Sequence, residues 1–584
     1  MVTKFRQIAM AGLALFLALP TLAIAHDGTN PAPSPMPTDP TADTQIALNR
    51  AALTFGGTNN GAILTGAQTA SISFTNGTST WSVTTDATWL TINPASGSGS
   101  ATFRVSVNPG TYPNGLTQSA TLTIEAAGVP NSPLTLPVQL TIFASTYAPS
   151  GLMETPLDNS TGVTGSVAVT GWAIDDIGLT EVSIWRDPVA GESVSSANGK
   201  VFIGRAVQVD GARPDVDAFN ASPYDYQAGW GYLLLTNMLP DQGNGTFKLH
   251  AYATDLEGQT TLLGSKTIVA DNAHATDPFG AIDTPEQGAT VSGSEYVNFG
   301  WVLGAQDNVI PIDGSTITVF IDGVPVGHPQ YNFARSDIQA LFPGHANTDG
   351  AVGFYILDTT RLSNGAHTIA WGVSDAAGHS EGIGSRFFTV LNGTSSSITI
   401  TSSIMITSSI MTSSSIMTTP ALVQGSNGLE DVTRQQAIVG TDTGKSLATV
   451  SSIAVSDVPT YAQTGFAMNA PLEMLETTAA GGSRLAIEEL GVIRATIGGP
   501  VEGEADGYEG YMVKAGRLEA LPSGSFLDRC TGEFFWHPGV GFVGTYEFVF
   551  IRKTDGKRER IPLSIEIAPR ERAKQMLLPS CTIR

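Results

Sequence analysis

Short runs in which apolar residues alternate with hydroxyl-bearing ones recur along most of the chain. Examples are residues 71–74 (SISF), 82–84 (SVT) and 101–107 (ATFRVSV), each followed closely by glycine, proline, asparagine or aspartate. Alternation with a period of two puts the apolar side chains on one face of a strand and the polar side chains on the other. The pattern predicts an all-β chain of tandem immunoglobulin-like β-sandwich domains joined by linkers.

A chain of 584 residues is too long for one hydrophobic core, so we expect several domains. Shifts in composition and turn spacing mark their limits. The expected divisions are a signal peptide at 1–25, a Pro- and Thr-rich linker at 26–47, sandwich domains at 48–143, 152–273 and 280–391, a Ser/Thr/Ile/Met low-complexity linker at 392–424 and a C-terminal β domain at 425–584.

The first 25 residues have the pattern of an export signal. Lys4 and Arg6 precede an apolar stretch at 8–19, and Ala23-Ile24-Ala25 places small residues where signal peptidase cleaves. Cleavage before His26 predicts a secreted protein, extracellular or at the cell surface, with the periplasm as an alternative. An uncleaved anchor stays open, but we expect no membrane span in the mature chain.

One motif lies in the first expected sandwich. Residues 89–97 read W-L-x-x-x-P-x-S-G, and the strand that follows ends at Asn108. On these residues the segment 48–143 resembles the BACON family of bacterial immunoglobulin-like domains. The resemblance implies a sandwich fold and an association with carbohydrate or mucin, although many family members serve as spacers. Trp81 and Trp89 are then either core residues, the favoured interpretation, or sugar platforms.

The next two domains form an internal repeat. The opening residues 154–156 (ETP) recur at 283–285 (DTP), and the pair Gly171-Trp172 recurs as Gly300-Trp301. A period of about 120–130 residues with matched ends indicates two homologous sandwiches. The motifs D-T-P-x-x-G-x-x-V-S-G and N-G-x-H-T-I-x-W-x-V-x-D make this pair similar to tandem immunoglobulin-like modules of large secreted proteins from environmental bacteria, a resemblance that implies architecture only.

The C-terminal region carries a third motif. Residues 521–538 read L-P-x-G-x-x-L-D-x-x-T-G-x-F-x-W-x-P and resemble the putative-Ig, cadherin-like bacterial domains. Phe534 and Trp536 alternate and are expected to point inward. The apolar spacing at 483–492 suggests a short helix, and 561–567 is expected to be an edge strand that tolerates Pro562.

Charge and cysteine content narrow the function classes. With 29 Lys+Arg against 52 Asp+Glu the net charge is −23, so nucleic acid is not an expected partner. The basic stretch from Arg552 to the C-terminus is interpreted as a solvated tail, with a surface for an acidic partner as the alternative. The two cysteines, Cys530 and Cys581, are expected to form a disulfide in an oxidising compartment.

No catalytic motif is found. The sequence has no G-x-S-x-G, H-E-x-x-H, P-loop or EF-hand series, and its eight histidines are scattered singly. We therefore expect a protein that is not an enzyme and needs no cofactor.

Acidic residues in the long loop of the first repeat are the candidates for calcium, which prefers several oxygen ligands. They are Asp210, Asp215, Asp217 and Asp225, with Asp175, Asp176 and Asp187 on other loops. The second repeat keeps Ala-Arg-x-Asp, as Arg335 and Asp337, but loses most other acids of this loop. A structural Arg–Asp clasp, Arg213 with Asp215, is therefore favoured over a metal.

The same region holds an aromatic set that is the candidate for glycan stacking: Tyr224, Tyr226, Trp230 and Tyr232. Core packing is the favoured alternative, because alternation of aromatic residues also marks an inward strand face. The leading hypothesis is a non-enzymatic extracellular scaffold or adhesion protein. The alternatives are an extracellular polysaccharide-binding accessory protein and, third, an enzyme with its site in 425–584. The partner, protein or polysaccharide, stays unknown.

Overall fold

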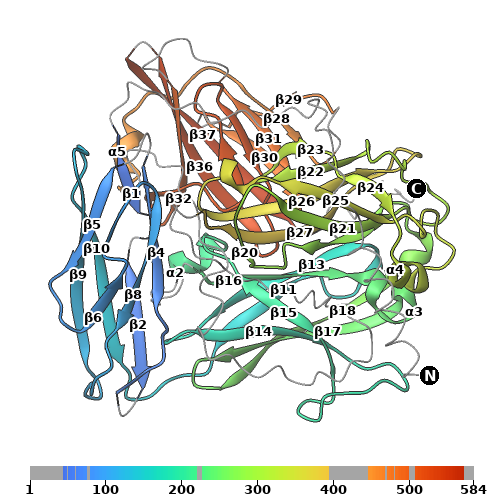
Figure 1. Ribbon diagram of the computed structural model, residues 1–584, viewed down its shortest axis with the longest axis horizontal. Coiled ribbons are helices and arrows are strands. Elements are labelled where there is room, and N and C mark those ends of the chain that lie inside the picture. Colours follow the sequence, from blue (N-terminus) through green and yellow to red (C-terminus); the bar gives the residue numbers. More distant parts are fainter. Residues whose placement is uncertain are drawn as a thin grey trace, which may run out of the picture.

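The computed structural model describes residues 44–570, except 49, 51, 59–60, 75–78, 220–226, 393–444, 467–469, 479–480, 499–506 and 555, and except the side chains of 217–219. These residues form a series of β-sandwiches (Figure 1), which confirms the predicted all-β fold. The predicted signal peptide and both predicted linkers lie almost wholly outside the described residues. Within the described part, none of the helices has the length and apolar character that crossing a membrane requires.

The first sandwich, residues 46–142, is made of two sheets with the orders β1-β4-β8-β6 and β3-β2-β10-β9-β5-β7. Phe55, Phe103 and Leu122 fill its core with no exposed surface, and the buried Trp81 donates from its indole Nε1 to the carbonyl of Gly99 at 3.0 Å. Trp81 is thus a core residue, as favoured. The strands are β1 (Ile46–Leu48), β2 (Leu53–Thr58), β3 (Ala62–Ile63), β4 (Gln68–Phe74), β5 (Thr80–Thr85), β6 (Leu90–Asn93), β7 (Ser96–Ser98), β8 (Ala101–Val107), β9 (Thr117–Ala126) and β10 (Leu134–Ile142).

The first repeat, residues 150–271, is one wrapped sheet of order β11-β13-β16-β15-β14-β17-β18-β12. Strand β15 pairs with β14 up to Ala206 and then with β16 through Val207 and Gln208, so it belongs to both layers. Its elements are β11 (Ser150–Thr155), β12 (Ser160–Val163), β13 (Ser166–Ile174), β14 (Leu179–Arg186), β15 (Val201–Gln208), α2 (Pro214–Phe219), β16 (Gly229–Leu235), η2 (Thr236–Met238), α3 (Pro240–Gly243), β17 (Asn244–Asp255), β18 (Thr260–Asp271) and η3 (Asn272–His274).

The second repeat, residues 279–390, has the same layout with one change. Its sheets are β19-β21-β25-β24 and β20-β27-β26-β22-β23, so the crossing strand of the first repeat is here split into β23 and β24. The tandem repeat predicted from the sequence is confirmed. The elements are β19 (Phe279–Thr284), β20 (Thr290–Val291), β21 (Tyr296–Leu303), β22 (Ile317–Ile321), β23 (Val324–Gly327), β24 (Gln330–Phe333), α4 (Ser336–Leu341), β25 (Val352–Leu357), η4 (Thr359–Arg361), β26 (Gly365–Ser374) and β27 (Ser380–Val390).

The C-terminal sandwich, residues 445–570, has sheets of order β29-β28-β31-β35-β34 and β30-β37-β36-β32-β33. Phe534 and Trp536 are fully buried, as their alternation predicts. The elements are α5 (Ala448–Ser451), β28 (Thr460–Thr464), β29 (Glu473–Met474), β30 (Ser483–Glu488), β31 (Ile493–Ile497), β32 (Gly507–Lys514), β33 (Arg517–Glu519), β34 (Ser525–Leu527), β35 (Glu533–Trp536), β36 (Gly544–Thr554) and β37 (Lys557–Ala568).

Two expectations for this sandwich are wrong. In the segment 483–492, predicted as a short helix, residues Ser483–Glu488 form strand β30, which is parallel to β37. Leu485 and Ile487 follow the alternation of a strand, and Leu490, just after it, adopts a positive φ of 66° that a helix does not allow. The terminal strand is not at an edge, since β37 lies between β30 and β36. Pro562 is tolerated there because it pairs only with Val549 of β36. The pairing of β37 with β30 begins at Leu563, so no partner in β30 needs the N–H that proline lacks.

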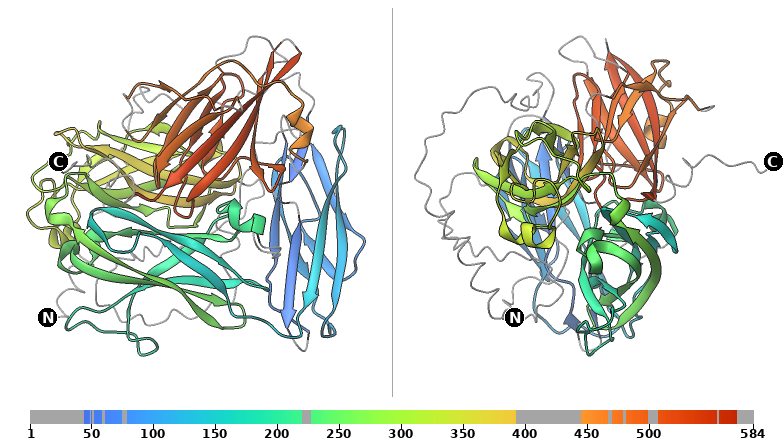
Figure 2. Two further views of the ribbon diagram at one scale, coloured as in Figure 1. Left: turned by 180° about the vertical axis from the view of Figure 1, so that it is seen from behind. Right: turned by 90° about the vertical axis from the view of Figure 1, so that its right-hand side faces the viewer.

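The sandwiches are packed against one another rather than spaced apart (Figures 1 and 2). The C-terminal sandwich, red in both figures, lies across the two repeats. Its hydrophobic core is continuous with Val207 and Val209 of the first repeat and Phe387 of the second. A smaller contact, Ala47 with Ala520, joins it to the first sandwich. The C-terminal sandwich therefore contacts all three other domains.

Glycines permit the closest of these approaches. A Cβ added to Gly231 of β16 would lie 2.3 Å from the backbone N of Gly541 and 2.4 Å from the backbone C of Val540. We expect Gly231→Ala to lower the free energy of unfolding by about 1–3 kcal/mol through overpacking. Thermal unfolding and small-angle scattering would measure the loss of stability and of compactness.

Gly110→Ala is the matched control, because a Cβ at Gly110 meets only the ring of Tyr112 at 3.5 Å. Equal melting temperatures and equal radii of gyration for the two variants would show that the docking of the C-terminal sandwich does not depend on Gly231.

Candidate functional site

The acid-rich loop of the first repeat forms the clasp that the shared Ala-Arg-x-Asp motif predicts. Arg213, just before α2, donates from Nε to Oδ1 of Asp215 at 2.9 Å and from Nη2 to Oδ2 at 2.6 Å. Its Nη1 donates to Glu154 at the end of β11. Arg335 of the second repeat binds the equivalent acids: its Nε donates to Oδ1 and Oδ2 of Asp337 at 2.9 and 3.1 Å, and its Nη1 donates to Asp283. In each repeat the arginine ties the opening strand to the loop that carries the short helix.

Burial sets the charge states of the first clasp. Desolvation alone would lower the pKa of Arg213, but its bonds to Asp215 and Glu154 outweigh that effect and keep the pKa above its ordinary value. Burial acts to raise the pKa of the Asp215 carboxyl, but the Arg213 guanidinium holds that pKa below its usual range. Burial raises the pKa of Glu154. The clasp is therefore a buried arginine held by two carboxylates that are partly exposed, and the charge of the arginine depends on those partners.

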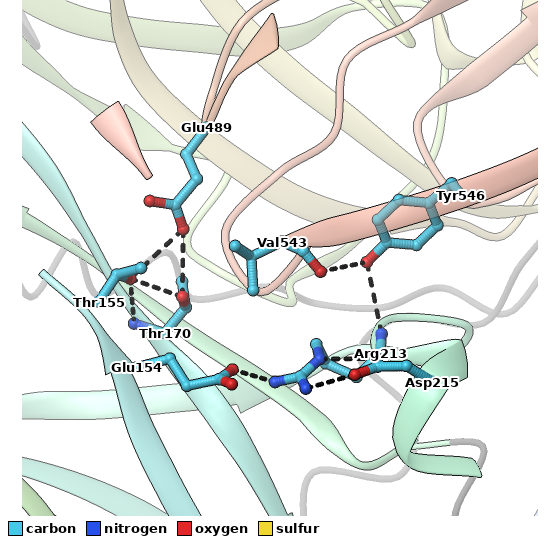
Figure 3. Close-up of polar contacts among 8 residues, drawn as sticks. All are labelled: Glu154, Thr155, Thr170, Arg213, Asp215, Glu489, Val543 and Tyr546. Carbon is cyan, nitrogen blue, oxygen red and sulfur yellow. Dashed lines mark hydrogen bonds and ion pairs between the residues drawn. The ribbon is translucent and has the colours of Figure 1, made fainter. Parts of the chain in front are cut away.

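The C-terminal sandwich covers this clasp, and Figure 3 shows the contacts. Glu489, between β30 and β31, accepts hydrogen bonds through Oε1 from the hydroxyls of Thr170 at 3.1 Å and Thr155 at 3.3 Å. The Tyr546 hydroxyl accepts from the backbone N of Arg213 at 3.4 Å. We call the clasp with Glu489 and Tyr546 the hub. It connects the first repeat to the C-terminal sandwich through buried polar groups.

The second repeat has no equivalent of the Thr155–Thr170 pair. Thr284 occupies the place of Thr155 and donates to the carbonyl of Val297 at 2.8 Å, as Thr155 does to that of Ala168 at 3.1 Å. The difference is that Phe299 stands in place of Thr170. Sequence reasoning missed Glu489 and both threonines. The one signal that distinguishes the repeats here is this Thr-to-Phe difference.

The calcium candidates have other roles where they are described. Asp215 belongs to the clasp, and the buried Asp210 accepts from Nε2 of Gln227 at 2.7 Å. The side chain of Asp217 and the whole of Asp225 lie outside the described residues. Among the described residues, no group of three or more His, Cys, Asp or Glu side chains is arranged to hold a metal ion.

The four aromatic residues that were candidates for glycan binding also lie in different environments. Tyr224 and Tyr226 lie outside the described residues. Trp230 has no exposed surface and packs in the core of the first repeat, so its ring offers no face to a sugar. Tyr232 is partly buried on β16, and desolvation raises its pKa to about 12. Of the four aromatic residues, Tyr232 alone is described and not completely buried.

The disulfide and the basic tail are described only in part. Cys530 is exposed, whereas Cys581 lies outside the described residues, so the disulfide stays a prediction. The described end of the basic stretch is not a free tail. Arg570 forms an ion pair with Glu381 of the second repeat and donates from Nη1 to the carbonyl of Ser166 in the first at 3.2 Å.

A cluster of carboxyl groups lies where the first sandwich meets the first repeat. It consists of Asp175, Asp176, Asp255 and Glu257, and Ile177 beside it packs against Gly56 of the first sandwich. Burial raises the pKa of Asp175 to about 6 and of Glu257 to about 7. Hydrogen bonds to these carboxyls oppose the rise, and the neighbouring carboxylates add to it. In the second repeat Asp375 occupies the position of Asp255. Its carboxylate contacts the imidazole Nδ1 of His379 at 2.9 Å. This cluster can take up protons near neutral pH.

Comparison with known families confirms the BACON resemblance. Residues 45–141 match the family model described as the viral BACON domain, and the match covers the first sandwich alone. No curated protein matches the chain. The chain is thus an immunoglobulin-like β protein whose first domain is BACON-like.

Several solved structures share the architecture at low identity. The immunoglobulin domains 1–4 of Sidekick-1 are 8% identical, cover 90% of this chain and 99% of their own, and have a TM-score of 0.20. The fibronectin(III)-like modules of Clostridium thermocellum CbhA are 12% identical over 41% of this chain and 94% of theirs, with a TM-score of 0.13. A Bacteroides ovatus GH5 xyloglucanase in complex with a XXXG heptasaccharide is 18% identical over 20% of this chain, with a TM-score of 0.14. The match spans only 22% of that enzyme.

The hub predicts a specific loss of stability. Glu489→Ala leaves the hydroxyls of Thr155 and Thr170 without their interdomain acceptor and should lower the free energy of unfolding by about 1–3 kcal/mol. Glu489→Gln keeps an acceptor oxygen and should lose less. Chemical denaturation measures both, with Glu473→Ala, at an exposed position on β29, as the control. A Glu489→Ala curve that coincides with the control would contradict the hub.

The carboxyl cluster predicts a pH dependence. Because its pKa values are raised on folding, the folded chain binds these protons more tightly than the unfolded chain. Stability should therefore fall as the pH rises through about 4 to 7. The double variant Asp175→Asn, Glu257→Gln removes this titration, and its melting temperature should exceed that of the unaltered chain by about 2–4 °C at pH 8.

At pH 4.5 most of that difference should disappear, since the acids are then largely protonated in the unaltered chain as well. Melting curves from pH 4.5 to 8 measure the difference. A constant offset across this range would mean that the carboxyl cluster does not titrate on folding.

Proposed function

We propose that this protein is a non-enzymatic extracellular scaffold that holds its immunoglobulin-like domains in one fixed arrangement and presents a binding surface to a partner. The observation that carries the proposal is the position of the C-terminal sandwich, which shares a hydrophobic core with both repeats. A chain of independent spacer domains does not need such a core. Fixed domain geometry is useful where several surfaces must meet one partner together.

Ion pairs at the end of the C-terminal sandwich support the same arrangement. The Arg570 side chain, 15% exposed, contacts Glu381 of the second repeat and the backbone of the first. Desolvation acts against its charge, but Glu381 keeps the pKa of Arg570 above its ordinary value. A buried charge of this kind is costly to expose alone, so breaking one partner destabilises the whole contact.

The proposed absence of enzymatic activity rests on how the hub is bonded. Arg213, Asp215 and Glu154 bind one another, and the threonine hydroxyls bond to Glu489. Catalysis requires a nucleophile or proton donor that can reach a substrate. Secretion, predicted from the first 25 residues, is part of the proposal, and the partner is an extracellular protein or polysaccharide.

The fixed arrangement has a direct test. Small-angle scattering of the full chain should give a profile that matches one compact body, and the double variant Gly231→Ala, Glu489→Ala should increase the radius of gyration. The control double variant is Gly110→Ala, Glu473→Ala. A profile of the unaltered chain that requires a flexible ensemble of separated domains would contradict the scaffold.

The second candidate function is a polysaccharide-binding accessory protein, and the BACON match of residues 45–141 favours it. A glycan array with the full chain decides between the two. We expect no binding that depends on the first sandwich, because Trp81 is buried there and the partly buried Trp89 packs against its core. Glycan binding that is lost when exposed residues of the first sandwich are replaced would favour the accessory role.

A further inference from the structure

Strand β26 of the second repeat turns one face to the C-terminal sandwich. A Cβ added to Gly524 of that sandwich would lie 2.7 Å from Cγ2 of Thr368, which has no exposed surface. A Cβ added to Gly372, further along the same face, would lie 2.9 Å from Cδ1 of Phe466. The Phe466 ring also meets the edge of Phe320, with the ring centroids 5.5 Å apart. The two domains therefore touch directly over this face of the strand.

A histidine of the C-terminal sandwich is enclosed in the same contact. His537, directly after β35, is 1% exposed, and neither of its ring nitrogens has a hydrogen-bond partner among the described residues. Its ring lies 6.1 Å from the Phe466 ring, at an interplanar angle of 82°. A Cβ added to Gly323 of the second repeat would lie 3.2 Å from the backbone N of His537. These surroundings suit an uncharged ring, because a buried charge needs water or an anion beside it.

The carboxylate that acts on His537 is already bound to another histidine. Asp322, in the turn between β22 and β23, contacts Nδ1 of His367 through Oδ2 at 2.5 Å and accepts from the backbone N of Thr368 through Oδ1 at 2.8 Å. The other ring nitrogen of His367 lies 2.9 Å from the carbonyl oxygen of Ser363. Because both ring nitrogens of His367 face acceptors, both carry protons and this ring is a cation. The charge of Asp322 is thus balanced before His537 takes up a proton.

Protonation of His537 therefore opposes docking of the C-terminal sandwich on the second repeat. Burial lowers the pKa of His537 to about 4, and Asp322 acts in the opposite direction without compensating it. Once the domains separate, water reaches the ring, and its pKa returns to the ordinary value of about 6.5. The separated state then binds the proton more tightly. Docking has its full strength above about pH 6.5 and weakens as the pH falls toward about 4.

His367 changes docking in a different pH range. Burial acts to lower its pKa, but Asp322 holds that pKa above its ordinary value. The contribution of the pair is complete below about pH 6.5 and is lost only as the pH rises further. Between about pH 6.5 and 4 the pair is constant, so the change in this contact comes from His537.

We propose that His537 is an acid-sensitive latch: protonation of its ring releases the C-terminal sandwich from the second repeat while each domain stays folded. The latch rests on the fixed arrangement proposed above and states when that arrangement opens. The carboxyl cluster at the boundary with the first sandwich has the opposite sign, since acid stabilises it. Mild acid thus loosens one domain boundary and not the other.

The test is thiol labelling of the full chain carrying Thr368→Cys. The Thr368 hydroxyl has no partner among the described residues, so the substitution removes no hydrogen bond there, and the new thiol reacts only when the domains separate. Peptide mapping by mass spectrometry distinguishes this thiol from Cys530 and Cys581. Each rate is divided by that of a short unstructured peptide thiol at the same pH, because the thiolate is the reactive form.

We expect the corrected labelling rate to rise about twentyfold from pH 7 to pH 5, the change that a pKa of about 4 in the docked state and about 6.5 in the separated state produces. In the presence of His537→Gln the rise should fall to less than about twofold, because no group at this position titrates. His537→Phe, which keeps a ring of similar size, should do the same and serves if the glutamine variant does not fold. His274→Gln, at a side chain that is 82% exposed, is the matched control and should keep the full rise.

A second thiol distinguishes release from unfolding. Val373→Cys lies in the core of the second repeat, so its thiol reacts only when that domain itself opens, and its corrected rate should stay constant from pH 7 to pH 5. An equal rise at Val373→Cys would overturn the latch, and so would a rise at Thr368→Cys that persists in both His537 variants.

Slow labelling of Thr368→Cys that does not depend on pH would overturn the latch alone and leave the fixed arrangement standing. Labelling that is already fast at pH 7, together with an extended scattering profile, would contradict the fixed arrangement itself.

Discussion

The arrangement of this molecule depends on the apolar surface that the C-terminal sandwich shares with both repeats. Val207, Val209, Ala212 and Phe387 of the repeats complete a core whose other buried members belong to the C-terminal sandwich. Burial of such surface is non-directional, so it favours contact without fixing its geometry. The geometry is set by backbone approach at Gly231 and by the buried carboxylate of Glu489, which require particular partners at particular places.

The two repeats show how closely related sandwiches come to play different roles. Both keep the arginine clasp, because each must tie a helix-bearing loop to its opening strand. Only the first presents paired threonine hydroxyls to Glu489, while Phe299 occupies the second position in the other copy. A further difference is that the strand corresponding to β15 is divided into β23 and β24 in the second repeat. Small substitutions on a common frame thus give the two copies different contacts with the C-terminal sandwich.

Electrostatics at the domain boundaries follows from burial. At the boundary with the first sandwich, Asp175 and Glu257 lie among other acids, and desolvation raises the pKa of each. Between the repeats, burial lowers the pKa of Arg386, and the nearby Asp283 and Glu286 oppose that effect. The pH-sensitive boundary is therefore a consequence of closing the domains onto one another, and it would not exist in separated sandwiches.

The sequence by itself determined what depends on near neighbours in the chain: strand alternation, turns, the repeat, the BACON motif and the Arg–Asp clasp, whose residues lie two positions apart. It misjudged residues 483–492 and the place of Pro562, because helix or strand and edge or interior depend on which strand pairs alongside. Only the tertiary structure brought Glu489 to Thr155, 334 positions away, and Arg570 to Glu381, 189 positions away. One sequence holds no signal for such pairs, since contact between distant surfaces follows from how whole domains pack.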